Sequence, residues 1–286
     1  MNTLDHYDDM YYLASRYANR PDIVQGAGGN FSVKISPDTL LVKASGRTFD
    51  EITKDGDGIA SIRYDKIREY LLSDESKDLS EKDHLNFLRS HTKTENVPSM
   101  EAWFHAILKK YVLHTHSVYV NTLGCSKEGP GLFSGLMDEM GLDHLVLPYH
   151  NPGFELGRAV AMKLSENKEI PMVIFLQNHG IIVTADTKEE CVDLHSKIEK
   201  AIKERLAITR TFDETDLDES ETRDYSNLVL FPDQAVYPRH PQIRAAFRFI
   251  LNEIKRHEFE ARAIDRKDSE TVTNMESEKY RMNLSK

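Results

Sequence analysis

Two histidines separated by one residue are the clearest candidates for chemistry in this chain. His114 and His116 follow the apolar run 111–113. Because side chains alternate faces along a strand, both imidazoles are expected on the same side, close enough to bind one ion. A third candidate, His179, follows the apolar run 172–176. Three imidazoles leave coordination positions open, which is typical of a catalytic metal site, although one His-x-His pair in a chain with 12 histidines is weak evidence by itself.

A carboxylate precedes the histidine pair by a short interval. The segment 98–108 is typical of a helix, with Ser99 as its N-cap and Glu101 in its first turn. This helix would end just before the His114 strand, so Glu101 could lie over the metal. An acidic residue in a first turn is also what the helix dipole favours. Beside an open metal that polarises a carbonyl, a carboxylate can move protons.

Glycines cluster at 26–29, before an expected strand at 31–35. This strand would pair with a second one at 39–46 through the turn 36–38. A dinucleotide site of the G-x-G-x-x-G type is excluded, because counting from Gly26 puts Phe31 at the last glycine position and a strand follows where a helix is required.

Exposed backbone amides in this region could instead form a concave nest for an anion such as phosphate. A plain turn and bulge would use the same glycines equally well. The candidates for this nest are Gly28, Gly29 and Asn30 at the first strand, together with Ser45 and Gly46 at the end of the second strand. Local positive charge could come from Lys34, Lys43 and Arg47.

Helical and strand-like patterns alternate as far as residue 209, which implies a layered α/β domain with helices covering a sheet. Helices are expected at 4–17, 66–72, 82–89, 118–123, 131–140, 155–164, 187–209 and 242–255. Further strands are expected at 59–64 and 144–148, with a strand pair at 173–183 that turns near residues 178–180.

The 286 residues suit one large domain, alone or with an appendage. A net charge of -10 argues against sequence-independent nucleic-acid binding, which needs a basic face, so no nucleic-acid partner is expected. No apolar run approaches the roughly 18 residues of a membrane span, and the first residues lack a signal-peptide pattern, so a cytoplasmic protein without membrane contact is expected. The two cysteines, Cys125 and Cys191, are expected to be small buried residues, because their spacing indicates neither a disulfide framework nor a thiolate metal site.

Residues 213–224 hold seven carboxylates and one arginine and indicate an exposed linker. The expected division is therefore a metal-binding domain at 1–212 and an acidic linker with a helical extension at 213–286.

Six blocks of sequence, taken together, resemble the class II aldolase and adducin head-domain family, which includes L-fuculose-phosphate and L-rhamnulose-phosphate aldolases. The resemblance runs from about Ile23 to Thr209. The blocks, in order, are GAGGNFSVK, LLVKASG, PSMEAWFH, VLHTHS, YHNPG and FLQNHGIIV.

The resemblance implies a three-layer α-β-α fold with a central, mainly antiparallel sheet, followed here by a helical C-terminal tail. It implies that the three histidines bind Zn²⁺ or another divalent ion such as Mn²⁺, Co²⁺ or Fe²⁺, and that Glu101 is the acid/base. Expected phosphate contacts are Gly29, Asn30, Ser45, Gly46 and Ser99. The chain departs from the fuculose-phosphate enzymes at Met100, where they have a second serine before the glutamate.

The implied reaction is metal-dependent cleavage or formation of a carbon–carbon bond in a ketose phosphate, giving dihydroxyacetone phosphate and an aldehyde. Epimerisation or dehydration at the same metal, and a non-catalytic adducin-like scaffold, are the alternatives. The family also suggests a homo-oligomer, often a tetramer, with a tyrosine near the C-terminus that completes the site. Tyr280 is the candidate here, with simple packing as the alternative role.

Overall fold

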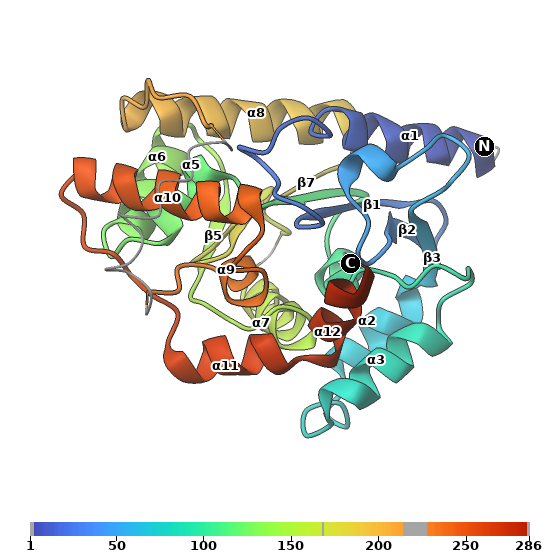
Figure 1. The fold of residues 1–286 in the computed structure, drawn as a ribbon. Helices are drawn as coiled ribbons and strands as arrows, with labels where there is room; N and C mark the ends of the chain where they lie inside the picture. The colour runs from blue at the N-terminus through green and yellow to red at the C-terminus, as the bar shows by residue number, and fades with distance from the viewer. Residues whose placement is uncertain (1–2, 168, 214–227, 285–286) are drawn as a thin grey trace.

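The computed structural model describes residues 3–167, 169–213 and 228–284. Within these ranges, seven strands form one sheet in the order β3-β2-β1-β4-β7-β6-β5 (Figure 1). Neighbouring strands are antiparallel except for β5 and β6, which confirms the mainly antiparallel central sheet. The strands are β1 (Asn30–Lys34), β2 (Thr39–Lys43), β3 (Ile59–Arg63), β4 (Tyr111–Thr115), β5 (His144–Leu147), β6 (Val173–Leu176) and β7 (Gly180–Ala185).

Helices cover both faces of this sheet (Figure 1). Alternate residues of each strand pack into different apolar clusters, so that Leu113 joins the cluster under α1 and α8, whereas Val112 packs toward α4 and α7. The expected layered arrangement is confirmed. The helices before the C-terminal extension are α1 (Thr3–Ser15), α2 (Tyr64–Leu72), α3 (Glu81–Ser90), α4 (Ala102–Ile107), α5 (Val118–Gly124), α6 (Gly129–Glu139), α7 (Phe154–Ser165) and α8 (Lys188–Arg205), with a 3₁₀ turn η1 (Phe49–Glu51).

The centre of the sheet brings together the segments that hold the candidate site. The β1–β2 hairpin forms as expected, and β4 lies between β1 and β7. In this register His114 is opposite Asn30 on one side and Ile182 on the other. His114 therefore has both the glycine-rich loop and the turn that precedes β7 as neighbours.

Helix α4 begins later than the sequence pattern predicts. It starts at Ala102 with Glu101 as its N-cap, instead of starting after Ser99. The reason is a tertiary contact: the Ser99 amide donates to the Lys43 carbonyl at 3.1 Å, and Pro98 bridges to Ala44 beyond the end of β2. Residues 98–99 therefore extend the sheet, and Glu101 sits at the point where the chain turns from the sheet into the helix.

Most of the expected acidic linker at 213–224 lies outside the described residues, which stop at 213 and resume at 228. Four helices lie within the described range 228–284. They are α9 (Pro232–Val236), α10 (Pro241–Arg256), α11 (Arg266–Asn274) and α12 (Glu276–Leu284). Helix α10 packs on α5, and its apolar side belongs to the same cluster as the sheet and α8. Figure 1 shows these orange and red elements lying across the front of the molecule, from α10 beside α5 to α12 beside α3. The division at residue 212 stays a prediction about chain organisation.

Both cysteines are buried and unpaired, as the sequence suggests. No helix among the described residues is both long enough and apolar enough to cross a membrane.

A buried polar cluster ties α8 to the centre of the sheet. The His195 ring lies 3.1 Å from the Tyr17 hydroxyl through Nδ1 and 2.8 Å from Thr115 Oγ1 through Nε2. Burial lowers the pKa of His195 to about 3, so the folded chain keeps this imidazole neutral. The unfolded chain, in contrast, protonates it below about pH 6.5.

His195 should therefore make the free energy of unfolding depend on pH. Its folded pKa lies below its unfolded pKa, so its contribution is complete above about pH 6.5 and is lost as the pH falls, by roughly 1.4 kcal/mol for each pH unit. Urea unfolding at pH 7.5 and 5.5 measures this loss. The His195→Gln protein, whose amide does not titrate, should lose less stability over the same interval; an equal loss in both proteins would contradict the assignment.

Candidate metal centre

Three imidazoles and one carboxylate converge in a buried cluster formed by Glu101, His114, His116 and His179. One donor atom from each lies within 4.8 Å of those of the others. His114 Nε2 is 3.5 Å from Glu101 Oε2, and His179 Nε2 is 3.3 Å from Glu101 Oε1. His116 Nε2 is 3.1 Å from His114 Nε2. The structure thus brings together the four residues that sequence reasoning selected for metal chemistry.

The turn between β6 and β7 delivers His179 to this cluster. Gly180 begins β7 against the end of β4, and a Cβ there would lie 2.1 Å from the Thr115 carbonyl oxygen, so only glycine permits this approach. Asn178, with φ of 55°, completes the tight turn. The Asn121 side chain donates to the His179 carbonyl at 3.1 Å and ties the turn to α5.

The hydrogen bonds of the Nδ1 atoms of His114 and His116 show that their Nε2 atoms face the cluster. His114 Nδ1 lies 3.0 Å from the Ile181 carbonyl oxygen, and His116 Nδ1 lies 2.7 Å from Asp233 Oδ2. Both partners are acceptors, so both Nδ1 atoms carry a proton, and in the neutral rings both Nε2 atoms present lone pairs. Two such lone pairs only 3.1 Å apart repel each other unless a proton or a metal ion lies between them. The donor set therefore fits a divalent metal.

The electrostatics of the cluster agree with that fit. Burial lowers the pKa of His114 to about 4 and that of His179 to about 3, so both rings are neutral at neutral pH, which is the form that binds metals. Burial opposes ionisation of Glu101, but the surrounding histidines and the Asn30 amide outweigh it and hold its pKa below the usual range. Glu101 Oε1 is buried and accepts no hydrogen bond within the described part of the chain.

A chain of hydrogen bonds behind Glu101 holds its carboxylate in place. Asn30 Nδ2 donates to Glu101 Oε2 at 2.7 Å, while Asn30 Oδ1 is 2.5 Å from His105 Nε2. His105 Nδ1 is in turn 2.7 Å from Ser32 Oγ. Because the Asn30 carbonyl oxygen can only accept, His105 carries its proton on Nε2 and accepts from Ser32. One oxygen of Glu101 is thus anchored, and the other faces the histidines.

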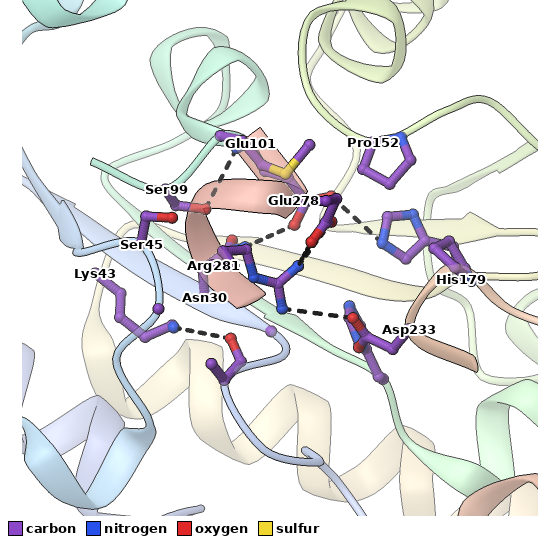
Figure 2. Close-up of a pocket in the computed structure, with 16 residues that line it drawn as sticks. Asn30, Lys43, Ser45, Ser99, Glu101, Pro152, His179, Asp233, Glu278 and Arg281 are labelled. Carbon is purple, nitrogen blue, oxygen red and sulfur yellow. Dashed lines mark hydrogen bonds and ion pairs between the residues drawn. The ribbon is translucent and has the colours of Figure 1, made fainter. Parts of the chain in front are cut away.

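The expected phosphate-binding residues border one cavity with the metal cluster (Figure 2). They are Gly29, Asn30, Ser45, Gly46 and Ser99, joined by Met100. Of the three expected basic residues, only Lys43 lines this cavity. Lys34 instead donates to the Leu108 carbonyl, and Arg47 pairs with Glu51 at 3.3 Å.

Lys43 is a buried cation at the floor of the glycine-rich loop. Its ammonium donates to the carbonyl oxygen of Ala27 at 3.1 Å and to that of Arg47. These contacts join the two loops that line the cavity. Burial lowers the pKa of Lys43 to about 7, so an anion bound nearby would favour its charged form.

Three further charged residues line the cavity, and sequence reasoning did not select them. Asp233 comes from α9, and Glu278 and Arg281 come from α12 (Figure 2). Arg281 Nη1 donates to both Glu278 oxygens at 2.8 and 2.9 Å, and Arg281 Nη2 donates to Asp233 Oδ1 at 3.4 Å. Burial disfavours the charge of Asp233, but His116 and Arg281 outweigh it and lower its pKa well below the usual range. Only the Pro-Asp pair, typical of a helix start, marked Asp233 in the sequence.

Tyr280 does not reach this cavity. It is not among the lining residues, and its ring lies 5.9 Å from the Arg89 guanidinium, toward α3. Residues 278 and 281 of the same helix point inward instead. They leave a cavity of about 20 Å³, which is room for about one water molecule.

Comparisons with known proteins agree with this fold. Residues 9–206 match the family described as "Class II Aldolase and Adducin N-terminal domain". The chain therefore belongs to the class II aldolase and adducin family, as the sequence blocks suggest. No curated protein sequence matches it.

Several solved structures have a fold similar to that of this chain. The N-terminal class II aldolase domain of a conserved protein from Thermoplasma acidophilum is 26% identical, with a TM-score of 0.60 over 70% of this chain and 92% of that chain. YgbL from Klebsiella pneumoniae, titled a putative aldolase/epimerase/decarboxylase, is 19% identical, with a TM-score of 0.52 over 73% and 92%. An L-fuculose 1-phosphate aldolase is 17% identical, with a TM-score of 0.51 over 87% and 98%. The last two show the fold alone.

Replacing His116 by alanine should lower the amount of transition metal that the purified protein retains, because one of three converging imidazoles is lost. Elemental analysis after dialysis measures metal per chain. The matched control is His144→Ala, since this histidine lies away from the cluster and bonds Ser134. Equal metal content in wild type and His116→Ala would refute the ligand assignment.

Proposed function

We propose that this protein is a metal-dependent aldolase that cleaves or forms a carbon–carbon bond in a ketose phosphate, giving dihydroxyacetone phosphate and an aldehyde. The observation that carries the proposal is the buried cluster in which two Nε2 lone pairs and the Glu101 carboxylate converge beside the glycine-rich loop. His114, His116 and His179 would hold the metal, Zn²⁺ or a similar divalent ion.

A divalent ion held there would supply the Lewis acidity that stabilises negative charge developing on a ketose carbonyl oxygen. Glu101 would transfer the proton. Its Oε2 is anchored by Asn30, so the side chain is held in one orientation, and its Oε1 accepts no hydrogen bond among the described residues. That free oxygen is the atom suited to accept a proton from substrate or to return it.

The second part of the cavity would bind the phosphate group. Gly29, Gly46, Ser45 and Ser99 border it, and their amides and hydroxyls would donate to the anion. Lys43 would add the positive charge that an anion requires. Met100 also lines this part, so a thioether takes the place of the hydroxyl found in the fuculose-phosphate enzymes.

Substrate entry would require a movement of α12. A cavity of about 20 Å³ is far too small for a ketose phosphate, since small-molecule sites are typically about 300–1,000 Å³. Glu278 and Arg281 occupy the space between the cluster and the glycine-rich loop (Figure 2). Displacement of α12 removes both side chains together.

Retro-aldol assays test this function directly. The metal-loaded protein should release dihydroxyacetone phosphate from at least one member of a panel of ketose 1-phosphates, detected by a coupled enzyme. The unphosphorylated ketose should react at least roughly 10-fold more slowly, because each hydrogen bond to a charged group contributes about 1.5–3 kcal/mol. Inorganic phosphate should compete with substrate. Equal rates for both forms of the sugar would exclude the proposed phosphate site.

The Glu101→Gln protein should keep its fold and metal but lose turnover by roughly 10²-fold or more, as expected when an acid/base group is removed. The amide has nearly the same shape but cannot take up a proton. Turnover and metal content should be measured on the same sample, with Glu139→Gln, at the surface end of α6, as the control. Wild-type turnover would leave Glu101 with only a role at the helix start.

Epimerisation or dehydration of a sugar phosphate is the second candidate, because the same metal and carboxylate would serve either reaction. An adducin-like scaffold does not need converging imidazole lone pairs. A homo-oligomer is part of the proposal on family grounds. Within one chain Tyr280 points away from the site, so a catalytic role for it stays a prediction that requires an assembly.

A further inference from the structure

The C-terminal extension contacts the candidate metal centre at two places. Asp233 of α9 accepts a hydrogen bond from His116 Nδ1 at 2.7 Å. The side-chain amide of Asn178, next to His179, donates to the carbonyl oxygens of Leu230 and Arg262 at 2.9 and 2.7 Å. The family match ends at residue 206, so these contacts come from outside the matched domain.

The contact between Asp233 and His116 is closely packed. Both side chains are buried, with 3% and 7% of their surface exposed. A Cβ on Gly28 would lie 2.8 Å from Asp233 Oδ2 and 2.9 Å from His116 Nδ1, so the bare glycine backbone covers this hydrogen bond and shields it from water. In such surroundings a charge-assisted hydrogen bond is strong and its geometry is restricted.

The two oxygens of Asp233 have different partners. Oδ2 bonds the imidazole, whereas Oδ1 accepts from Arg281 of α12 at 3.4 Å. Pro232 begins α9 and fixes the backbone immediately before the aspartate. The carboxylate is therefore held from both sides, and it fixes His116 as the tautomer with Nε2 facing His114.

We propose that Asp233 is a positioning residue of the metal centre, which orients His116 and makes it a better ligand, so that the C-terminal extension is an integral part of the site. The inference rests on the metal-dependent function proposed above. A carboxylate that accepts from the outer nitrogen of a ligand histidine fixes the ring and raises the basicity of its inner nitrogen. Asparagine would keep an acceptor but lose the charge, and alanine would leave His116 Nδ1 without this acceptor.

Zinc affinity measures this role without reference to turnover. Competition with a chromophoric chelator should give a Zn²⁺ dissociation constant about 10–100-fold higher for Asp233→Ala than for wild type, with a smaller increase for Asp233→Asn. Asp265→Asn is the matched control, because Asp265 caps α11 away from the site and asparagine caps a helix equally well. The control should bind Zn²⁺ with wild-type affinity. Wild-type affinity in both Asp233 variants would overturn the proposal.

A second variant separates positioning of His116 from anchoring of α12. Ser277→Ala removes the hydrogen bond at 2.6 Å that ties α12 to Glu81 of α3, and it leaves both partners of Asp233 in place. Its Zn²⁺ affinity should stay within about 3-fold of wild type, well short of the effect of losing the carboxylate that accepts from His116. If Ser277→Ala weakens zinc binding as much as Asp233→Ala does, the effect passes through α12 and the proposal is wrong. Should Asp233→Ala fail to fold, the isosteric Asp233→Asn variant decides the comparison.

These measurements also separate the inference from the aldolase assignment. Zinc binding that depends on Asp233, in a protein without retro-aldol activity, would support the positioning role and reject the proposed reaction. If the protein has retro-aldol activity but its zinc affinity does not change in the Asp233 variants, the proposed reaction is supported and the positioning role is rejected.

Discussion

Repulsion among buried donor atoms is the constraint on which the rest of this structure depends. The fold holds two imidazole lone pairs 3.1 Å apart and adds a carboxylate within 3.5 Å, in surroundings that exclude water. Packing among neutral groups does not relieve that repulsion, whereas a proton or a divalent cation between the two nitrogens does. The carbonyl oxygen of Ile181 and the Asp233 carboxylate, which fix the outer nitrogens, keep the inner ones from turning away.

The central strands explain how the chain maintains such an arrangement. Strand β4 lies between β1 and β7 and is buried along its length, so its position is set by hydrogen bonds on both edges. The loop before β1 lines the cavity, and the turn before β7 supplies His179. The loops that line the site are thus held in place by hydrogen-bonded strands at the centre of the sheet.

The sequence alone predicted much of this arrangement, for reasons that are local. The two-residue period of a strand places His114 and His116 together. The apolar run before His179 and the helix pattern around Glu101 made these residues candidates, and the family blocks implied their roles. The start of α4 was predicted too early, because the pairing of residues 98–99 with the end of β2 is a tertiary contact that a helix-cap pattern does not reveal. Asp233 and Arg281 were missed because they approach the site from more than 100 residues beyond His116, without periodicity or spacing relative to it.

The contacts between the extension and the metal cluster also couple two equilibria. If docking of α9 orders His116, then a cation bound by the cluster strengthens that docking by the same factor by which docking strengthens metal binding, since such coupling is reciprocal. Metal availability would then control how firmly the C-terminal helices are held against the sheet. Any molecule that displaces α9 would weaken metal binding, whereas displacement of α12 alone would leave the hydrogen bond between Asp233 and His116 in place.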